Sequence, residues 1–187
     1  MNILLDNLSS LKKYENIDTN FRCAIMFEIL MQDRDITKKD KILKTLQLFY
    51  KDTTQIEDIE QAINLVLDFY TKEKNEEVSE KNGCKNSKDR IFSYEYDADY
   101  IYSAFMQQYN INLQQIKYLH WWEFKALFNS LSDQTKFMKI IEYRTVNIAK
   151  IKDKNRKKFY KEMKKLYALP DMRTEEEKES DFANELW

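Results

Sequence analysis

Few residues in this chain of 187 amino acids have the type and spacing needed for catalysis or metal binding. His120 is the single histidine, and the two cysteines, Cys23 and Cys84, are far apart and form no paired motif. A zinc site made of histidine and cysteine would need all three residues to converge, and a Ser-His-Asp triad would also need His120. The spacing supports neither site, so we expect His120 to be partly buried beside the two tryptophans that follow it.

Phosphate-binding loops and dinucleotide fingerprints need several glycines at fixed spacing, and this chain has only Gly83. Asp97 and Asp99 could in principle bind a divalent ion. Carboxylates at positions i and i+2 do not share a helical face, however, so we expect Asp97 to cap a helix instead. The sequence therefore predicts no metal, no cofactor and no enzymatic activity.

The single glycine and the single proline, Pro170, also indicate the fold class. Hairpins and tight strand turns rely on Gly, Asn-Gly or Pro, whereas long helices need none of them. With 43% hydrophobic and 14% aromatic residues the chain can build a core, and its net charge of −1 does not favour general nucleic-acid binding. We therefore expect an all-α protein, with neither a signal peptide nor a membrane-spanning segment.

Apolar periodicity and capping residues predict three helices before a long polar stretch and four after it. These helices span about 18–32, 37–50, 54–70, 97–109, 112–131 with a break near His120, 132–144 and 153–169. Their expected first residues or caps are Asp18, Thr37, the Thr54–Glu57 capping box, Asp97, Asn112, Ser132 and Asp153. In the last helix we expect Phe159, Met163, Leu166 and Tyr167 to face inward.

The polar stretch suggests a division into two small helical subdomains of about three and four helices. Residues 1–71 form the expected N-terminal subdomain, and residues 92–170 form an aromatic-rich C-terminal one. Residues 72–91 are almost entirely polar and are expected to be a flexible linker. Residues 171–187 form an acidic tail that ends in Leu and Trp.

The densest aromatic cluster contains Trp121, Trp122, Phe124 and Phe128. Adjacent residues on a helix point about 100° apart, so two neighbouring tryptophans rarely fit one core. We therefore predict that these four residues bind a partner, because Trp is enriched as an anchor at interfaces. The alternative is that both tryptophans fill a broad core between helices.

Residues 150–165 are strongly basic, and five lysines form a candidate basic patch: Lys157, Lys158, Lys161, Lys164 and Lys165. Three interpretations stay open. The lysines could be the solvated face of an amphipathic helix, they could bind phosphates, or they could bind an acidic protein, including the acidic tail of this same chain. Arginine, which recognises bases better than lysine, is scarce here.

Several ordered motifs together resemble one family, the gp-fifteen family of tailed phages and prophages of Gram-positive bacteria. The matching runs are Ile17–Leu30, Asp97–Leu113, Leu119–Leu131, Thr135–Thr145 and Glu162–Pro170. The polar linker and the acidic tail are the variable parts. Asn110 and Asn112 stand where the family form Tyr-Gly-Ile-Asp-Leu has Gly and Asp, a change that a turn or a helix cap would tolerate.

The resemblance implies a tail assembly chaperone and brings no catalytic residues with it. Such a chaperone binds the phage tape-measure protein, helps to recruit the major tail-tube protein, and works in the host bacterial cytoplasm without entering the mature virion. A homo-oligomer is compatible with this role, and no membrane is involved. The alternatives are a nucleic-acid-binding phage protein that uses the basic helix 150–165 and a structural tail component retained in the virion.

Overall fold

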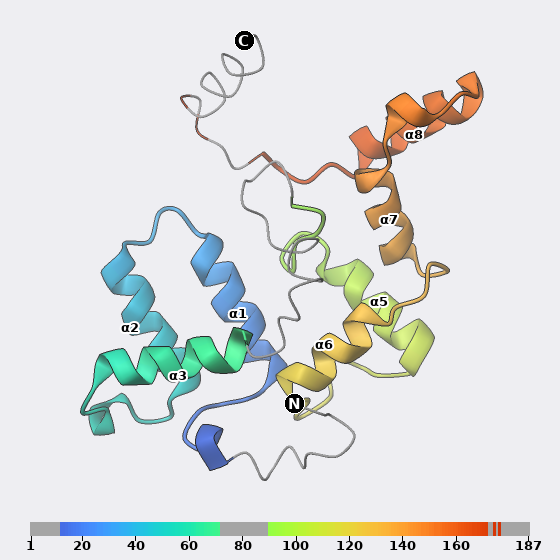
Figure 1. Ribbon diagram of the computed structural model, residues 1–187. Helices are drawn as coiled ribbons and strands as arrows, with labels where there is room; N and C mark the ends of the chain where they lie inside the picture. The colour runs from blue at the N-terminus through green and yellow to red at the C-terminus, as the bar shows by residue number, and fades with distance from the viewer. Residues whose placement is uncertain (1–11, 72–89, 172–173, 175, 177–187) are drawn as a thin grey trace. The chain divides into compact units, whose positions relative to one another are not determined.

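The computed structural model describes residues 12–71, 90–171, 174 and 176 (Figure 1). The predicted all-α class is confirmed: seven α-helices and three short 3-10 turns account for the regular structure of these residues. The helices are α1 (Phe21–Gln32), α2 (Lys38–Phe49), α3 (Ile59–Thr71), α5 (Ala98–Tyr109), α6 (Trp121–Asn129), α7 (Lys136–Thr145) and α8 (Lys154–Leu166). The 3-10 turns are Lys12–Tyr14, Thr53–Gln55 and Ile148–Lys150.

The helices pack into two compact units that do not follow the boundaries expected from the sequence. The first unit joins Met1–Asn75 to Ile101–Ser132, and the second joins Glu76–Tyr100 to Asp133–Trp187. The expected subdomains 1–71 and 92–170 are therefore not the packing units, because residues 101–132 pack with the N-terminal helices. The expected linker, 72–91, and the acidic tail, 171–187, lie almost wholly outside the described residues.

Two helices begin where their capping residues predict. The hydroxyl of Thr37 accepts a hydrogen bond from the backbone N–H of Asp40 at 3.2 Å, and it donates one to the Asp40 carboxylate at 2.7 Å. The carboxylate of Asp153 accepts a bond from the backbone N–H of Arg156 at 2.7 Å. In both cases a side chain satisfies a donor that the first helical turn leaves unpaired, so α2 and α8 start at fixed positions.

Three other starts differ from the prediction. Asn20, not Asp18, caps α1, because the Asp18 side chain accepts a hydrogen bond from the Asn20 backbone instead. Thr135, not Ser132, caps α7. The third case is α3, which begins at Ile59, beyond the 3-10 turn that contains the first residue of the predicted capping box.

The chain between α5 and α6 is not helical, although the sequence predicts a helix from Asn112. The Asn112 side chain accepts hydrogen bonds from the backbone N–H groups two and three residues later, which closes a turn. The guanidinium of Arg22 in α1 then donates to the carbonyl oxygens of Leu113 at 2.7 Å and Ile116 at 2.8 Å. These carbonyls are bound by a side chain from α1 instead of by a helical turn.

Asn110 explains one feature of the family motif. It is the only non-glycine residue with a positive φ among the described residues, at 54°. This left-handed conformation ends α5, where the backbone N–H of Asn110 donates to the carbonyl of Met106. Glycine adopts it most readily and Asn comes next, so the replacement of Gly by Asn at this position is compatible with the same turn.

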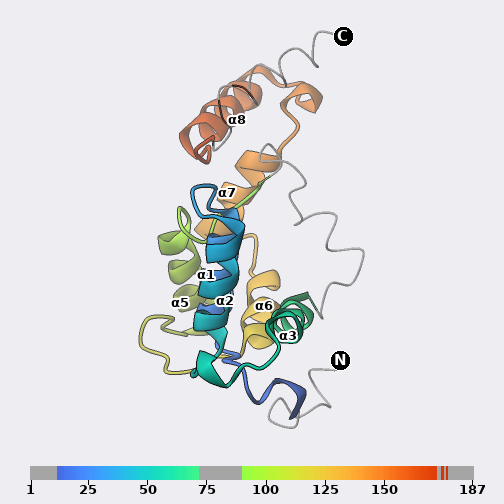
Figure 2. The ribbon, with the colours of Figure 1, turned by 90° about the vertical axis from the view of Figure 1, so that its left-hand side faces the viewer.

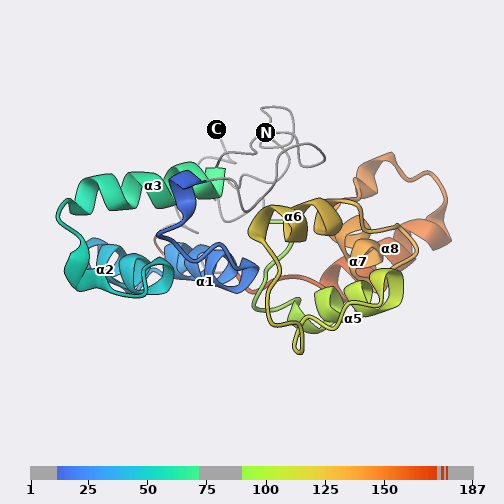
Figure 3. The ribbon, with the colours of Figure 1, turned by 90° about the horizontal axis from the view of Figure 1, so that it is seen from below.

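Short backbone pairing joins the two sequence segments of the first unit. The N–H of Phe21 donates to the carbonyl of Leu119, and the N–H of Trp121 donates to the carbonyl of Thr19, both at 2.9 Å. This places the start of α1 beside the start of α6. α2 packs against both α1 and α3, and α1 packs against α6 (Figure 3). The bridge therefore fixes how α6 enters the core of the N-terminal helices.

The two tryptophans of α6 both lie in this core. Trp121 stacks on Tyr70 with ring centroids 5.6 Å apart, and Trp122 contacts Phe69 at 5.3 Å. The indole N–H of Trp122 donates to the carbonyl of Phe69 at 3.1 Å. The indole N–H of Trp121 is buried and has no hydrogen-bond partner among the described residues.

The difference in hydrogen bonding between the two indoles predicts that replacing each tryptophan with phenylalanine destabilises the protein to a different extent. Trp122→Phe should lower the free energy of unfolding more than Trp121→Phe, by about 1 kcal/mol, because only the former breaks a buried hydrogen bond. Urea unfolding followed by circular dichroism measures both values. An equal or larger loss for Trp121→Phe would contradict the assignment of these two indole groups.

Arg144 organises the second unit. Its Nη1 and Nη2 atoms donate to the two carboxylate oxygens of Asp97 at 2.6 and 2.8 Å, and its Nε donates to the carbonyl of Tyr167 at 2.6 Å. The Asp97 carboxylate also accepts a bond from the backbone N–H of Ser93. The expected capping role of Asp97 is thus replaced by a buried ion pair. Arg144 thereby ties the segment before α5 to α7 and to the residue that follows α8. α8 packs against α7 (Figure 2).

Breaking this pair should be costly. Arg144→Met leaves the Asp97 carboxylate buried without its partner, which typically costs about 3 to 5 kcal/mol. Lys139→Met, an exposed site on the same helix, is the matched control. Urea unfolding of both variants tests the pair, and similar stabilities for the two would show that Arg144 does not hold this unit together.

Candidate partner-binding surface

The aromatic cluster predicted to bind a partner lies in the core. Trp121, Trp122 and Phe124 are buried, and Phe128 is half-buried. Phe124 stacks on Phe21 at 4.9 Å and on Phe105 at 5.1 Å, so it joins three helices of the first unit. The alternative interpretation, that both tryptophans fill a broad core, fits this structure, and the cluster does not form an exposed surface.

His120 is buried, as expected of a residue beside the tryptophans, and it caps α6. Its Nδ1 accepts a hydrogen bond from the backbone N–H of Trp122, and its own backbone N–H donates to the carboxylate of Glu123, each at 3.2 Å. This is a capping box with histidine in the place of Ser or Thr. Burial lowers the pKa of His120 to about 4, which keeps the ring neutral and Nδ1 free to accept.

The lowered pKa predicts a loss of stability in mild acid. Below the ordinary histidine value of about 6.5 the unfolded chain takes up a proton that the folded chain refuses until about pH 4, so stability falls across this window. His120→Asn keeps a capping acceptor but removes the titrating group. Between pH 7.5 and pH 5 the wild type should therefore lose about 1 to 2 kcal/mol more than the variant.

Urea unfolding at the two pH values measures the loss. If the wild type and His120→Asn lose the same stability, the acid sensitivity comes from other groups.

The structure gives no support for metal or thiol chemistry within the described residues. These residues contain no group of three or more His, Cys, Asp or Glu side chains placed to hold a metal ion. Burial and the neighbouring Asp18 raise the pKa of Cys23 to about 12, so its thiol stays protonated at neutral pH. Cys84 lies outside the described residues.

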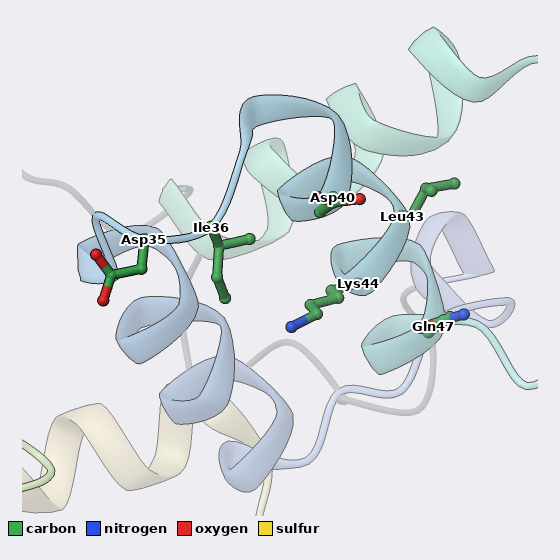
Figure 4. A pocket seen from close by; sticks show the side chains of 6 residues that line it. All are labelled: Asp35, Ile36, Asp40, Leu43, Lys44 and Gln47. Carbon is green, nitrogen blue, oxygen red and sulfur yellow. The ribbon is translucent and has the colours of Figure 1, made fainter.

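A hollow of about 380 Å³, open to solvent, lies beside α2 and the residues that precede it (Figure 4). It is lined by Asp35, Ile36, Asp40, Leu43, Lys44 and Gln47. Ile36 and Lys44 extend toward its middle (Figure 4). The lining mixes one apolar edge with unlike charges, and it offers no convergent set of groups for catalysis.

The five lysines of the candidate basic patch, in contrast, are all exposed on α8. Helical geometry places Lys157, Lys158, Lys161, Lys164 and Lys165 within an arc of about 120°. The helix as a whole carries seven basic residues and one acidic residue, Glu162. The five lysines therefore lie on one face of α8 and concentrate positive charge there.

The apolar side of α8 is only partly covered. Tyr143 of α7 contacts Phe159 at 5.9 Å, Tyr160 at 6.0 Å and Tyr167 at 5.9 Å between ring centroids. Tyr160 also donates from its hydroxyl to the Glu142 carboxylate at 2.6 Å. α7 therefore covers the edge of the helix that carries the tyrosines and part of the Phe159 ring.

The opposite apolar edge is exposed. Leu166 is 67% exposed, and Phe159, although its ring contacts Tyr143, is still 45% exposed. The prediction that both residues face inward is therefore wrong. The apolar stripe of α8 is wider than the single helix α7 can cover. Met163, between the two edges, is half-buried. We call Phe159, Leu166 and the five lysines the α8 surface.

The α8 surface combines two kinds of contact. Its apolar edge can bury Phe159 and Leu166 against a partner, and its lysine arc can pair with acidic groups beside the partner's apolar residues. An acidic amphipathic segment is the kind of partner that would fit this surface. The sequence signal for the apolar edge was the breadth of the stripe.

These observations define an all-helical protein with a basic amphipathic helix on its surface. Residues 4–169 match the family described as Bacteriophage Gp15 protein, and the chain belongs to this family. It is therefore a phage protein, as the sequence motifs imply. No curated protein and no solved structure matches the chain. Among the described helices, none has the length and apolar character needed to cross a membrane.

Proposed function

We propose that this protein is a tail assembly chaperone that binds the phage tape-measure protein and supports assembly of the tail tube. The resemblance to the gp-fifteen family supports this role. The observation that carries the proposal is the α8 surface, where Phe159 and Leu166 are exposed beside five lysines. The protein acts by binding and catalyses no reaction.

Before the tail tube exists, a tape-measure protein needs a partner that keeps it soluble. It is a long helical chain with apolar stripes that would otherwise associate with one another. A partner that covers such a stripe must offer apolar contacts and must stay soluble itself. The α8 surface meets both needs, because its apolar edge is narrow and its lysines are strongly hydrated.

The proposed setting follows from this role. The chaperone works in the host bacterial cytoplasm, also contacts the major tail-tube protein, and leaves before the virion is complete. Self-association into a homo-oligomer would present several α8 surfaces to one long partner, which would increase the avidity of binding.

Co-expression with the tape-measure protein encoded by the same phage tests the proposal. In moderate salt the tape-measure protein should become soluble and co-purify with the wild-type chain. The double variant Phe159→Ser and Leu166→Ser should reduce co-purification about ten-fold, because it removes two apolar contacts.

The matched control changes exposed apolar residues of the first unit. Met26 and Ile59 are 53% and 52% exposed, and Met26→Ser with Ile59→Ser should leave co-purification unchanged. A tape-measure protein that stays insoluble beside the wild-type chain would exclude the chaperone role. Equal losses for both double variants would show that α8 is not the contact.

The lysine arc favours a second function, nucleic-acid binding, which salt distinguishes from the first. Binding to phosphates should weaken steeply between low and moderate salt, whereas apolar contacts persist. A third function, a structural tail component, is tested by mass spectrometry of purified particles, which should contain no copy of a chaperone.

A further inference from the structure

The α8 surface carries more positive charge than its neighbours neutralise. Among the described residues, the ion pairs of the five lysines are limited to one contact, between Lys158 and Glu162 at 4.0 Å. Both side chains of that pair are largely exposed, so it contributes little. The negative charges that neutralise this surface must therefore come from outside the described residues or from solvent ions.

The chain supplies a complementary segment directly after α8. Residues 175–187 contain six acidic residues and one basic residue, Lys178. They also contain three large apolar residues, Phe182, Leu186 and Trp187. Phe182 and Leu186 are four residues apart, the spacing that aligns two side chains on one side of a helix. The segment therefore has the acidic and apolar character that the α8 surface fits.

The length of the chain allows this contact. Thirteen residues of α8 extend over about 20 Å, and the thirteen residues 175–187 cover at least that length in any regular conformation. The chain leaves α8 at Tyr167, whose carbonyl accepts a hydrogen bond from Arg144 at 2.6 Å. Residues 168–174 remain for a reversal of direction. A segment tethered so closely has an effective concentration in the millimolar range.

We propose that residues 175–187 dock onto the α8 surface of the same chain. Their apolar residues, Phe182, Leu186 and Trp187, contact Phe159 and Leu166. Their acidic residues face the five lysines. The docked segment covers the apolar edge while no partner is bound. This inference concerns the regulation of the surface on which the proposed function rests, but the docking itself needs no tape-measure protein.

Zero-length carbodiimide cross-linking of the full chain tests the docking. The reagent joins a carboxylate to a lysine amine only where the two are in contact, and peptide mass spectrometry identifies the pairs. Cross-links from residues 175–185 should concentrate on Lys157, Lys161, Lys164 and Lys165. Exposed lysines of α2, namely Lys38, Lys39 and Lys44, give the level of random collision in the same sample.

A full-length variant with Phe182→Ser, Leu186→Ser and Trp187→Ser keeps every charge and removes the apolar contacts. Its cross-links to α8 should fall to the level of the α2 lysines. Circular dichroism checks that its helices are unchanged. Cross-links that are as frequent on α2 as on α8 in the wild type, or that persist undiminished in this variant, would overturn the docking.

Mixing unlabelled chains with chains labelled with heavy nitrogen separates contacts within one molecule from contacts between two. We expect the two peptides of each cross-linked pair to be either both labelled or both unlabelled. Predominantly mixed pairs would overturn the proposal in favour of an exchange of tails between copies.

Co-purification then separates docking from the proposed function. The triple-serine variant should retain more tape-measure protein than the wild type, since its α8 surface is uncovered. If the wild type shows the cross-links but neither chain binds the tape-measure protein, the docking stands and the chaperone role fails.

Discussion

The guanidinium of Arg144 joins three segments that are far apart in the sequence: the residues before α5, the helix α7 on which it lies, and the residue that follows α8. A planar group with five donors can do this, whereas a lysine amine could not match two carboxylate oxygens and two carbonyls at once. Arg144 fixes the point where the chain leaves α8, and together with the contacts of Tyr143 and Glu142 it sets the position of α8 on α7. The exposure of Phe159 and Leu166, and hence the α8 surface, depends on that position.

The first unit is governed by a different constraint, the need to bury two adjacent tryptophans on one short helix. Both tryptophans are buried because each packs against different neighbours. Trp121 lies flat on Tyr70, and Trp122 fits among Tyr14, Phe69 and His120. The core of this unit is therefore broad, with α6 inserted beside α1 and α3. Aromatic residues on two sides of α6 are buried on both sides, as in the alternative that both tryptophans fill a broad core.

Local structure could be predicted from the sequence because its causes are local. One glycine and one proline were enough to indicate helices, and Thr37 and Asp153 marked two of the starts. The unit boundaries could not be predicted, because they arise from pairs such as Trp121 with Thr19, whose partners lie about a hundred residues apart and leave no periodic signal. The same applies to Asp97. Its type and position fit a helix cap, and only the arrival of Arg144 from α7 makes it half of a buried ion pair.

Because the backbone bridge joins residues 19–21 to residues 119–121, the core of the first unit can be completed only after α6 has been synthesised. Phe21 and Phe69 belong to helices that are complete by residue 71, yet the aromatic side chains that pack on them arrive with α6. A ribosome adding about 5 to 20 residues per second takes several seconds to supply them. During that interval the nascent N-terminal helices carry an open aromatic face.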